Sequence, residues 1–187
     1  TFVSAFFVTA CAEKVNFSFE TNGGTEIAAV EVSIGEEYTL PVAKRDGYNF
    51  KGWYTNSSFS GDAVTKVTPV ADATFYAKWA KLYNIELDAD GGTLNETLIT
   101  AEEGSGLYDA VKDYVPVKDG LVFGAWFKGI NAISETARVS GDVKLTAKYK
   151  LAYTVEIYRQ NLEQTGYEKD EDKTGYAYVG ETVTSDE

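Results

Sequence analysis

The sequence predicts an α+β fold in which strands dominate, built from tandem small modules with at most one short helix each. Three observations lead to this prediction. Several segments of the chain recur after an interval of about seventy residues, which is the mark of a repeat architecture. Apolar and polar residues alternate within the recurring segments, as in a strand with one buried face. Each alternating segment is followed by an Asn-Gly-Gly or Asp-Gly-Gly turn sequence.

The repeat is visible in three places along each copy. Residues 15–25 return as 83–93, residues 47–54 as 120–127, and residues 74–79 as 144–149. The interval between copies changes from 68 to 73 to 70 residues, so small insertions fall between the recurring strand segments. A third copy begins at Tyr153 and stops near its middle. We therefore expect modules at residues 15–80 and 81–150, followed by an incomplete repeat at 151–187.

Each module begins with an expected strand and a turn. Phe17 and Phe19 alternate with polar neighbours, and residues 22–24 tolerate the positive φ angles of a tight turn. A return strand is predicted over residues 27–32, ending at Gly35. The corresponding features of the second module are Ile85, Leu87, residues 90–92, residues 94–100 and Gly104.

One helix is predicted in the second module, over residues 107–114. Apolar residues there follow the i, i+3, i+4, i+7 spacing of a helical face, and Pro116 limits the helix. The equivalent residues 38–44 are fewer and contain Pro41, so at most one helical turn is expected there. We expect the last strands to fill the core with Trp53, Trp79, Trp126 and Tyr149.

The first eleven residues form an uncharged apolar stretch. It is too short to span a bilayer as a helix but fits the apolar region of a secretory signal whose basic start has been removed. Its last four residues, Val-Thr-Ala-Cys, resemble a bacterial lipobox. That resemblance implies lipid attachment at Cys11, with residues 1–14 as a truncated lipoprotein signal. The alternative is a buried core strand that carries an inert thiol.

The composition excludes many kinds of chemistry. There are 29 acidic and 17 basic residues, and a net charge of −12 opposes binding to nucleic acid. The absence of histidine removes histidine-dependent triads and zinc sites, and a single cysteine allows neither a disulfide nor a cysteine metal cluster. Residues 88–92 lack the ligand spacing of a calcium loop and are interpreted as a hairpin turn. We expect no catalytic residue, no metal site and no cofactor.

The repeated segments resemble the Listeria–Bacteroides repeat, the B-repeat of internalin B. The resemblance rests on Val-x-Phe-x-x-Asn-Gly-Gly, Gly-Tyr-x-Phe-x-Gly-Trp-Tyr and Thr-Phe-Tyr-Ala-Lys-Trp in the first module. The second module departs from it at Ala125, Phe127 and Tyr149. Residues 151–187 are similar to a mucin-binding-like repeat. These resemblances imply β-grasp-like modules in a bacterial surface protein and no catalytic residues.

The predicted function is that of a non-enzymatic surface protein. A lipid-anchored stalk or adhesion segment on the extracellular face of the bacterial envelope would bind, or present binding domains to, a host or environmental protein or glycan. Tyr54, Phe59 and Tyr76 are the candidate ligand-contact aromatics, because aromatic faces stack on sugars and anchor interfaces. The alternative is a carbohydrate- or protein-binding accessory module of a larger surface enzyme.

Overall fold

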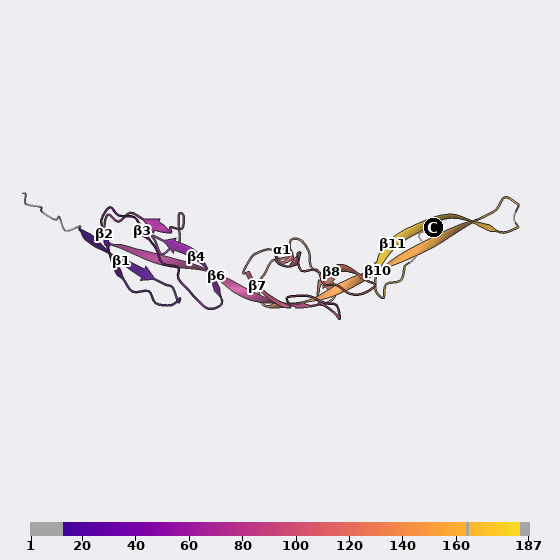
Figure 1. The fold of residues 1–187 in the computed structure, drawn as a ribbon, viewed down its shortest axis with the longest axis horizontal. Coiled ribbons are helices and arrows are strands. Elements are labelled where there is room, and N and C mark those ends of the chain that lie inside the picture. Colours follow the sequence, from indigo (N-terminus) through magenta and orange to yellow (C-terminus); the bar gives the residue numbers. More distant parts are fainter. Residues whose placement is uncertain (1–12, 164, 184–187) are drawn as a thin grey trace, which may run out of the picture. The chain divides into compact units, whose positions relative to one another are not determined.

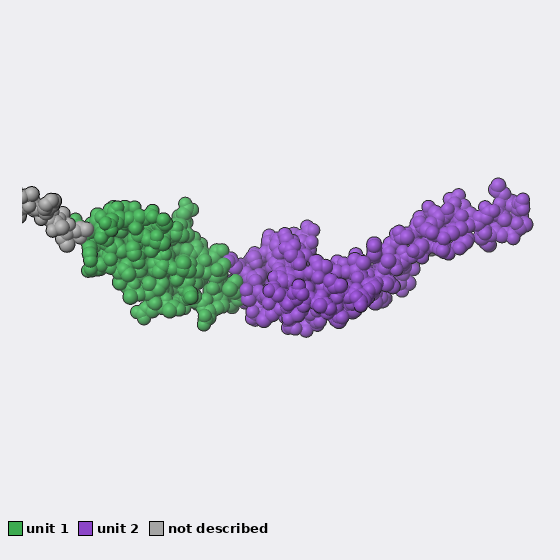
Figure 2. All heavy atoms as spheres, in the orientation of Figure 1, with its two compact units in different colours: residues 1–82 green, residues 83–187 purple. Residues whose placement is uncertain are grey.

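Strands dominate the fold, as predicted. The computed structural model describes residues 13–163 and 165–183, and its only helix within these ranges is the short α1 (Leu107–Val111) (Figure 1). The described residues form two compact units, which meet in the sequence between Leu82 and Tyr83 (Figure 2). Cys11, the predicted site of lipid attachment, lies outside the described residues.

Unit 1 is a small sheet in the order β2-β1-β6-β4, with a separate two-stranded pair beside it. β1 is antiparallel to β2 and parallel to β6, so the first and last strands of the unit are neighbours. β4 pairs with the other edge of β6 in the antiparallel sense, and β3 pairs with β5. The strands are β1 (Lys14–Glu20), β2 (Val30–Ser33), β3 (Tyr38–Thr39), β4 (Tyr48–Tyr54), β5 (Lys66–Val67) and β6 (Ala73–Asp88), of which unit 1 contains the part up to Leu82.

Unit 2 repeats this arrangement. Its first strand is the part of β6 from Tyr83 onward, which is parallel to β10, with Ile85 opposite Val143. β7 pairs with β6, and β8 is antiparallel to β10, in the positions that β2 and β4 hold in unit 1. The further elements are β7 (Leu98–Glu102), β8 (Val122–Lys128), β9 (Asn131–Ala132), β10 (Val143–Gln160) and β11 (Tyr167–Tyr178).

Each unit has a hydrophobic core of its own. In unit 1 the core includes Phe17, Trp53 and Phe75, each 1% exposed. In unit 2 the residues equivalent to these three are Ile85, Trp126 and Leu145, and Leu87 and Tyr149 are buried with them. Three of the four predicted aromatic core residues are thus buried, whereas Trp79 is partly buried at the edge of the unit 1 core.

The turn after the first strand was predicted correctly, but the return strand begins later than predicted. Asn22 and Gly23 have φ angles of 48° and 85°. β2 begins only at Val30 because the residues after the turn bond elsewhere: the Thr25 amide donates to the carbonyl of Lys44 at 2.8 Å. Unit 2 repeats both features with Asp90, Gly91, Thr93, Leu98 and Val117.

The helix α1 is also shorter than the predicted span 107–114. Leu107 and Val111 are buried as the helical pattern requires, but the chain continues from residue 112 as a turn. The Tyr114 carbonyl accepts a hydrogen bond from the Trp126 indole at 3.0 Å, which holds this segment away from a helical path just before Pro116. In unit 1 the Trp53 indole makes the corresponding bond to the Pro41 carbonyl at 2.6 Å.

Residues after Tyr149 form a two-stranded ribbon within unit 2. β10 continues to Gln160, and β11 pairs with it from Gln160↔Tyr167 to Lys150↔Tyr178. Most residues of the ribbon are exposed, and none in its strands from Leu151 onward is buried; this part of β10 and β11 is labelled in Figure 1. Such a ribbon is marginally stable alone, so its contacts with β8 stabilise it at its base. There the Tyr178 ring contacts Phe127 with centroids 5.7 Å apart.

A charge network across β6 and β10 surrounds the Asp88 carboxylate of unit 2. Asp88 accepts a hydrogen bond from the Asp90 amide at 3.0 Å and forms a 3.2 Å salt bridge with Lys144. These contacts lower the pKa of Asp88, the backbone hydrogen bond most. A carboxylate whose pKa is lower in the folded state stabilises the fold above its ordinary pKa of about 3.9 and loses this contribution as the pH falls through the folded value.

We therefore expect Asp88→Asn to reduce the acid sensitivity of unit 2. Urea midpoints measured at pH 6 and pH 3 should differ less in Asp88→Asn than in the unaltered protein, because the variant cannot bind the proton that destabilises the fold. Asp119→Asn, at an exposed loop carboxylate, is the matched control and should keep the unaltered difference. Equal acid sensitivity in all three proteins would contradict this role of Asp88.

Candidate binding surfaces

The three candidate aromatics of unit 1 lie close together but are not equally accessible. Tyr54, at the end of β4, is only 9% exposed and contacts the edge of Phe59, with ring centroids 5.7 Å apart at 84°. Phe59 and Tyr76 are half-buried and line one surface pocket. Tyr54 therefore packs against Phe59 without lining the pocket, whereas Phe59 and Tyr76 line it.

This unit 1 pocket has a volume of about 550 Å³ and combines aromatic, basic and polar side chains. The sequence interpretation missed most of its members, because they come from three strands (β1, β4 and β6) and from three different loops. Its lining residues are Glu20, Asn22, Arg45, Tyr48, Ser57, Phe59, Tyr76, Ala77, Lys78 and Trp79. The Gly-Tyr of the repeat motif was a signal for Tyr48, but no motif pointed to Arg45.

Phe59 is held in an unusual backbone conformation. Its φ of 54° lies in the left-handed region, which is uncommon for a bulky residue and persists only where surrounding contacts fix it. The Asn56 side chain provides these contacts. Its oxygen accepts from the Ser60 amide at 3.1 Å and from the Ser58 hydroxyl at 2.7 Å, and its nitrogen donates to the Ser60 carbonyl at 2.9 Å. The loop thus presents the Phe59 ring in a fixed position.

Two cations stand beside these rings. The Arg45 guanidinium lies 3.7 Å from the centre of the Tyr48 ring, and its Nη1 donates to the Asn22 carbonyl at 2.9 Å. The Lys78 ammonium lies 5.0 Å from the centre of the Tyr54 ring. Neither cation forms a salt bridge with any residue that the structure describes. With these two cations and one carboxylate, Glu20, in its lining, the pocket has a net positive charge on an acidic protein.

Unit 2 has a pocket at the equivalent place, with a volume of about 610 Å³. Asp90, Lys118, Leu121, Lys148 and Tyr149 occupy the positions of Asn22, Arg45, Tyr48, Lys78 and Trp79. Its other lining residues are Phe127, Gly129, Ile130, Tyr178, Val179 and Glu181. Tyr178, from the end of β11, lies on Phe127 at 5.7 Å and 85°, which is nearly the geometry of Phe59 on Tyr54.

The two pockets differ in charge. In the unit 2 pocket Lys148 forms a 3.3 Å salt bridge with Asp90, and Lys118 donates to the Asp90 carbonyl oxygen. Glu181 adds a second carboxylate to the lining. In unit 1 the position of Asp90 is taken by the neutral Asn22, whose side chain donates to the Ala77 carbonyl at 2.8 Å. The lining of the unit 2 pocket thus has two carboxylates for two lysines, whereas that of unit 1 has only Glu20 for Arg45 and Lys78.

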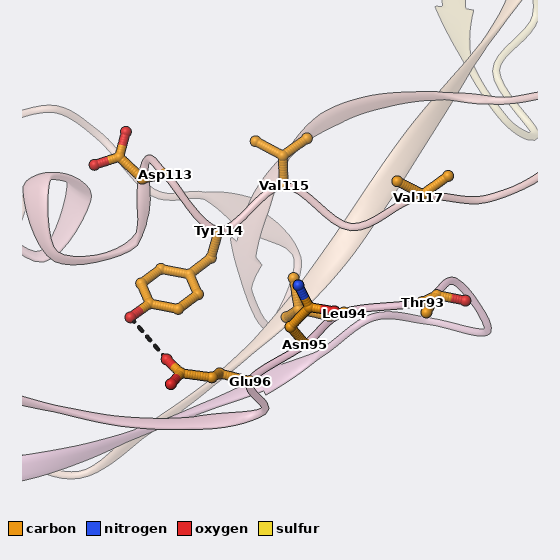
Figure 3. Close-up of a pocket in the computed structure, with 8 residues that line it drawn as sticks. All are labelled: Thr93, Leu94, Asn95, Glu96, Asp113, Tyr114, Val115 and Val117. Carbon is orange, nitrogen blue, oxygen red and sulfur yellow. Dashed lines mark hydrogen bonds between the residues drawn. The ribbon is translucent and has the colours of Figure 1, made fainter.

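A third pocket, of about 490 Å³, lies beside the segment that follows α1 (Figure 3). Tyr114 reaches across it, and its hydroxyl donates to Glu96 at 3.0 Å; this bond raises the pKa of Tyr114. Val115 and Val117, on the same segment as Tyr114, are 53% and 68% exposed. Tyr114 is the one aromatic residue among the lining residues of this pocket, and its hydroxyl is already hydrogen-bonded to Glu96. This pocket therefore offers less for ligand recognition than the unit 1 pocket.

The described residues contain neither a metal-ligand cluster nor a membrane-spanning helix. Within the ranges 13–163 and 165–183, His, Cys, Asp and Glu form no group of three or more that could hold a metal ion. In the same part of the chain, no helix has the length and apolar character needed to cross a membrane.

Two copies of one small strand-rich unit, each with its own core and a pocket at the same place, define a modular repeat protein. The chain belongs to the Listeria-Bacteroides repeat domain family, whose profile matches residues 16–78 and 83–148. The resemblance seen in the sequence is thereby confirmed for both modules.

Two relatives from Evansella cellulosilytica are similar to the chain. One, named "Putative Gly-rich membrane protein", is 30% identical over 157 residues, or 80% of the chain. The other, named "Putative membrane protein", is 31% identical over 114 residues, or 59% of the chain. The chain spans only 17% of the length of each relative. Their names and the repeat family fit a surface repeat protein.

Proposed function

We propose that the chain is a non-enzymatic stalk and adhesion segment on the extracellular face of the bacterial envelope, anchored by lipid on Cys11. The observation that carries this proposal is the duplication of a self-contained unit. Phe17 and Ile85 lie at the centres of separate cores, so each unit can fold around its own apolar residues. Tandem units of this kind add reach and present surfaces without requiring a catalytic centre.

Further observations support this proposal. The relatives are named as membrane proteins, which fits an envelope location. In both units the first and last strands are parallel neighbours, which supports the β-grasp-like description of each module. The third segment, residues 151–187, remains a proposed mucin-binding-like repeat. The partner of the chain, whichever segment contacts it, would be a host or environmental protein or glycan.

The anchoring part of the proposal can be tested by acylation. We expect residues 1–187, expressed in a Gram-positive host behind a methionine and a basic start, to incorporate an alkyne-labelled fatty acid. Cys11→Ser should abolish this labelling, because the thiol is the acceptor. Added protease should digest the anchored protein on intact cells. Labelling that persists in Cys11→Ser, or complete protection from protease, would contradict the proposal.

A second function is favoured by the length of the relatives. Because the matched segment makes up 17% of each, those proteins have room for other domains. The chain would then be a carbohydrate- or protein-binding accessory module of a larger surface enzyme. The two functions differ in what the complete protein does to a bound ligand: an accessory module would raise the rate of ligand breakdown by the complete protein, and an adhesion segment would leave the ligand intact.

A further inference from the structure

We propose that the unit 1 pocket binds an acidic sugar, with the sugar ring stacked on Phe59 and Tyr76 and its carboxylate neutralised by Arg45 and Lys78. The proposal rests on the proposed function and deepens it, because it names the ligand class that an adhesion or accessory module would recognise. The class is a hexuronic acid unit within an acidic polysaccharide.

The charge of the ligand follows from comparing the two units. Lys148 has Asp90 as its counterion, whereas Lys78, at the equivalent position, lines a pocket in which the neutral Asn22 takes the place of Asp90. Arg45 adds a planar guanidinium already positioned by Tyr48 and by the Asn22 carbonyl, and such a group matches a carboxylate with two donors at once. The one carboxylate in the unit 1 lining, Glu20, forms no salt bridge with Arg45 or Lys78 among the described residues, so two cations and one anion leave this pocket with a net positive charge.

The sugar ring follows from the aromatic side chains. Phe59 is fixed by the Asn56 turn and supported by Tyr54, so stacking on it requires little further ordering. Tyr76, Tyr48 and Trp79 extend the aromatic lining, and Glu20 and Ser57 provide acceptors and a donor for hydroxyl groups. A volume of about 550 Å³ lies within the usual range for small-ligand sites, about 300–1,000 Å³.

A peptide fits the same pocket less well. Extended peptides bind by adding a strand to a free sheet edge, where unpaired backbone groups are available. Tyr76 instead lies on β6 between two paired strands, opposite Glu20 of β1 on one side and Tyr54 of β4 on the other. Recognition there must use side chains, which suits a sugar carrying a carboxylate.

The test is a calorimetric titration of the full chain with a tetrasaccharide of alternating glucuronic acid and N-acetylglucosamine. Two comparison ligands are used. The tetrasaccharide of N-acetylglucosamine alone lacks the carboxylate, and the peptide Tyr-Val-Gly-Glu, the sequence of residues 178–181, carries a carboxylate and an aromatic ring without a sugar. We expect saturable binding of the acidic sugar that weakens as salt is added. Lys78→Gln and Phe59→Ala should each reduce its affinity about tenfold. Lys148→Gln, the equivalent change in unit 2, should leave it unchanged.

Asn22→Asp is the most direct variant, because it places the unit 2 carboxylate in the unit 1 pocket. It should remove binding of the acidic sugar, and its thermal midpoint is measured to check that it still folds. If that midpoint falls, Lys78→Gln, at a half-buried surface residue, still tests the proposal. Equal binding of the neutral tetrasaccharide, tighter binding of the peptide, or no binding at all would each overturn the proposal. None of these results would affect the acylation and protease test, so failure of the ligand assignment and failure of surface display are distinguishable.

Discussion

Trp53→Ala should lower the free energy of unfolding of unit 1 by about 3–5 kcal/mol, the usual loss for removing a buried large aromatic side chain. Trp53 is 1% exposed, and its ring contacts Phe19 and Phe50 with centroids 5.1 and 5.5 Å away. The variant also removes the indole donor to the Pro41 carbonyl. A unit of this size has a small core, so a loss of this magnitude should leave much of unit 1 unfolded at room temperature.

The measurement is urea unfolding followed by the fluorescence of the remaining tryptophans. Trp53→Phe, which keeps a ring in the core but not the indole donor, should lose clearly less than Trp53→Ala. Val70→Ala, at a residue that is 80% exposed, is the control and should change the free energy by less than about 0.5 kcal/mol. A loss below about 1 kcal/mol in Trp53→Ala would mean that the core closes around the vacancy, contrary to its close packing.

The sequence was sufficient for the repeat, for the strand-rich class and for most of the core. Phe17 and Ile85 show why: alternation with period two places them on the same buried face whichever apolar residue is used. The prediction of a helix was also correct, because Leu107 and Val111 form one apolar helical face. Its end was wrong because a hydrogen bond from Trp126, a residue of β8, holds the Tyr114 carbonyl.

The unit 1 pocket could be predicted only in part. Phe59 and Tyr76 were selected as aromatics, but Arg45 and Lys78 join them through the pairing of β4, β6 and the loop before β4. Nothing in the local pattern shows that Arg45 stacks on Tyr48. The difference between Asn22 and Asp90 also acquires meaning only when the lysines beside them are seen in the fold.

The glycine pairs of the two turns were interpreted as residues that tolerate positive φ, and this applies to only one glycine of each pair. Gly23 and Gly91 have φ angles of 85° and 79°. Gly24 and Gly92 do not lie in the left-handed region, but an aromatic ring and a backbone carbonyl approach them closely. The second glycine is therefore required by packing, which no turn rule reveals.

Gly24→Ala and Gly92→Ala should accordingly each cost about 3 kcal/mol of unfolding free energy, near the upper end for overpacked sites. A Cβ on Gly24 would lie 2.6 Å from the Trp79 ring and 2.9 Å from the Lys44 carbonyl; one on Gly92 would lie 2.8 Å from the Val117 carbonyl. These neighbours cannot move freely. The Trp79 indole donates to the Thr21 carbonyl at 2.8 Å, and the Val117 carbonyl accepts from the Thr93 amide at 2.7 Å.

Urea midpoints of the two variants would be compared with that of Gly141→Ala, where an added Cβ meets nothing within 4 Å and φ is not positive. That control should be neutral or slightly stabilising, because alanine restricts the unfolded chain. A neutral Gly92→Ala would show that the Tyr149 ring and the Val117 backbone move aside at little cost. Similar losses in Gly24→Ala and Gly92→Ala would show that the same close approach of ring to turn stabilises both units, although one uses tryptophan and the other tyrosine. The repeat motif would then conserve a packing geometry across two different aromatic residues.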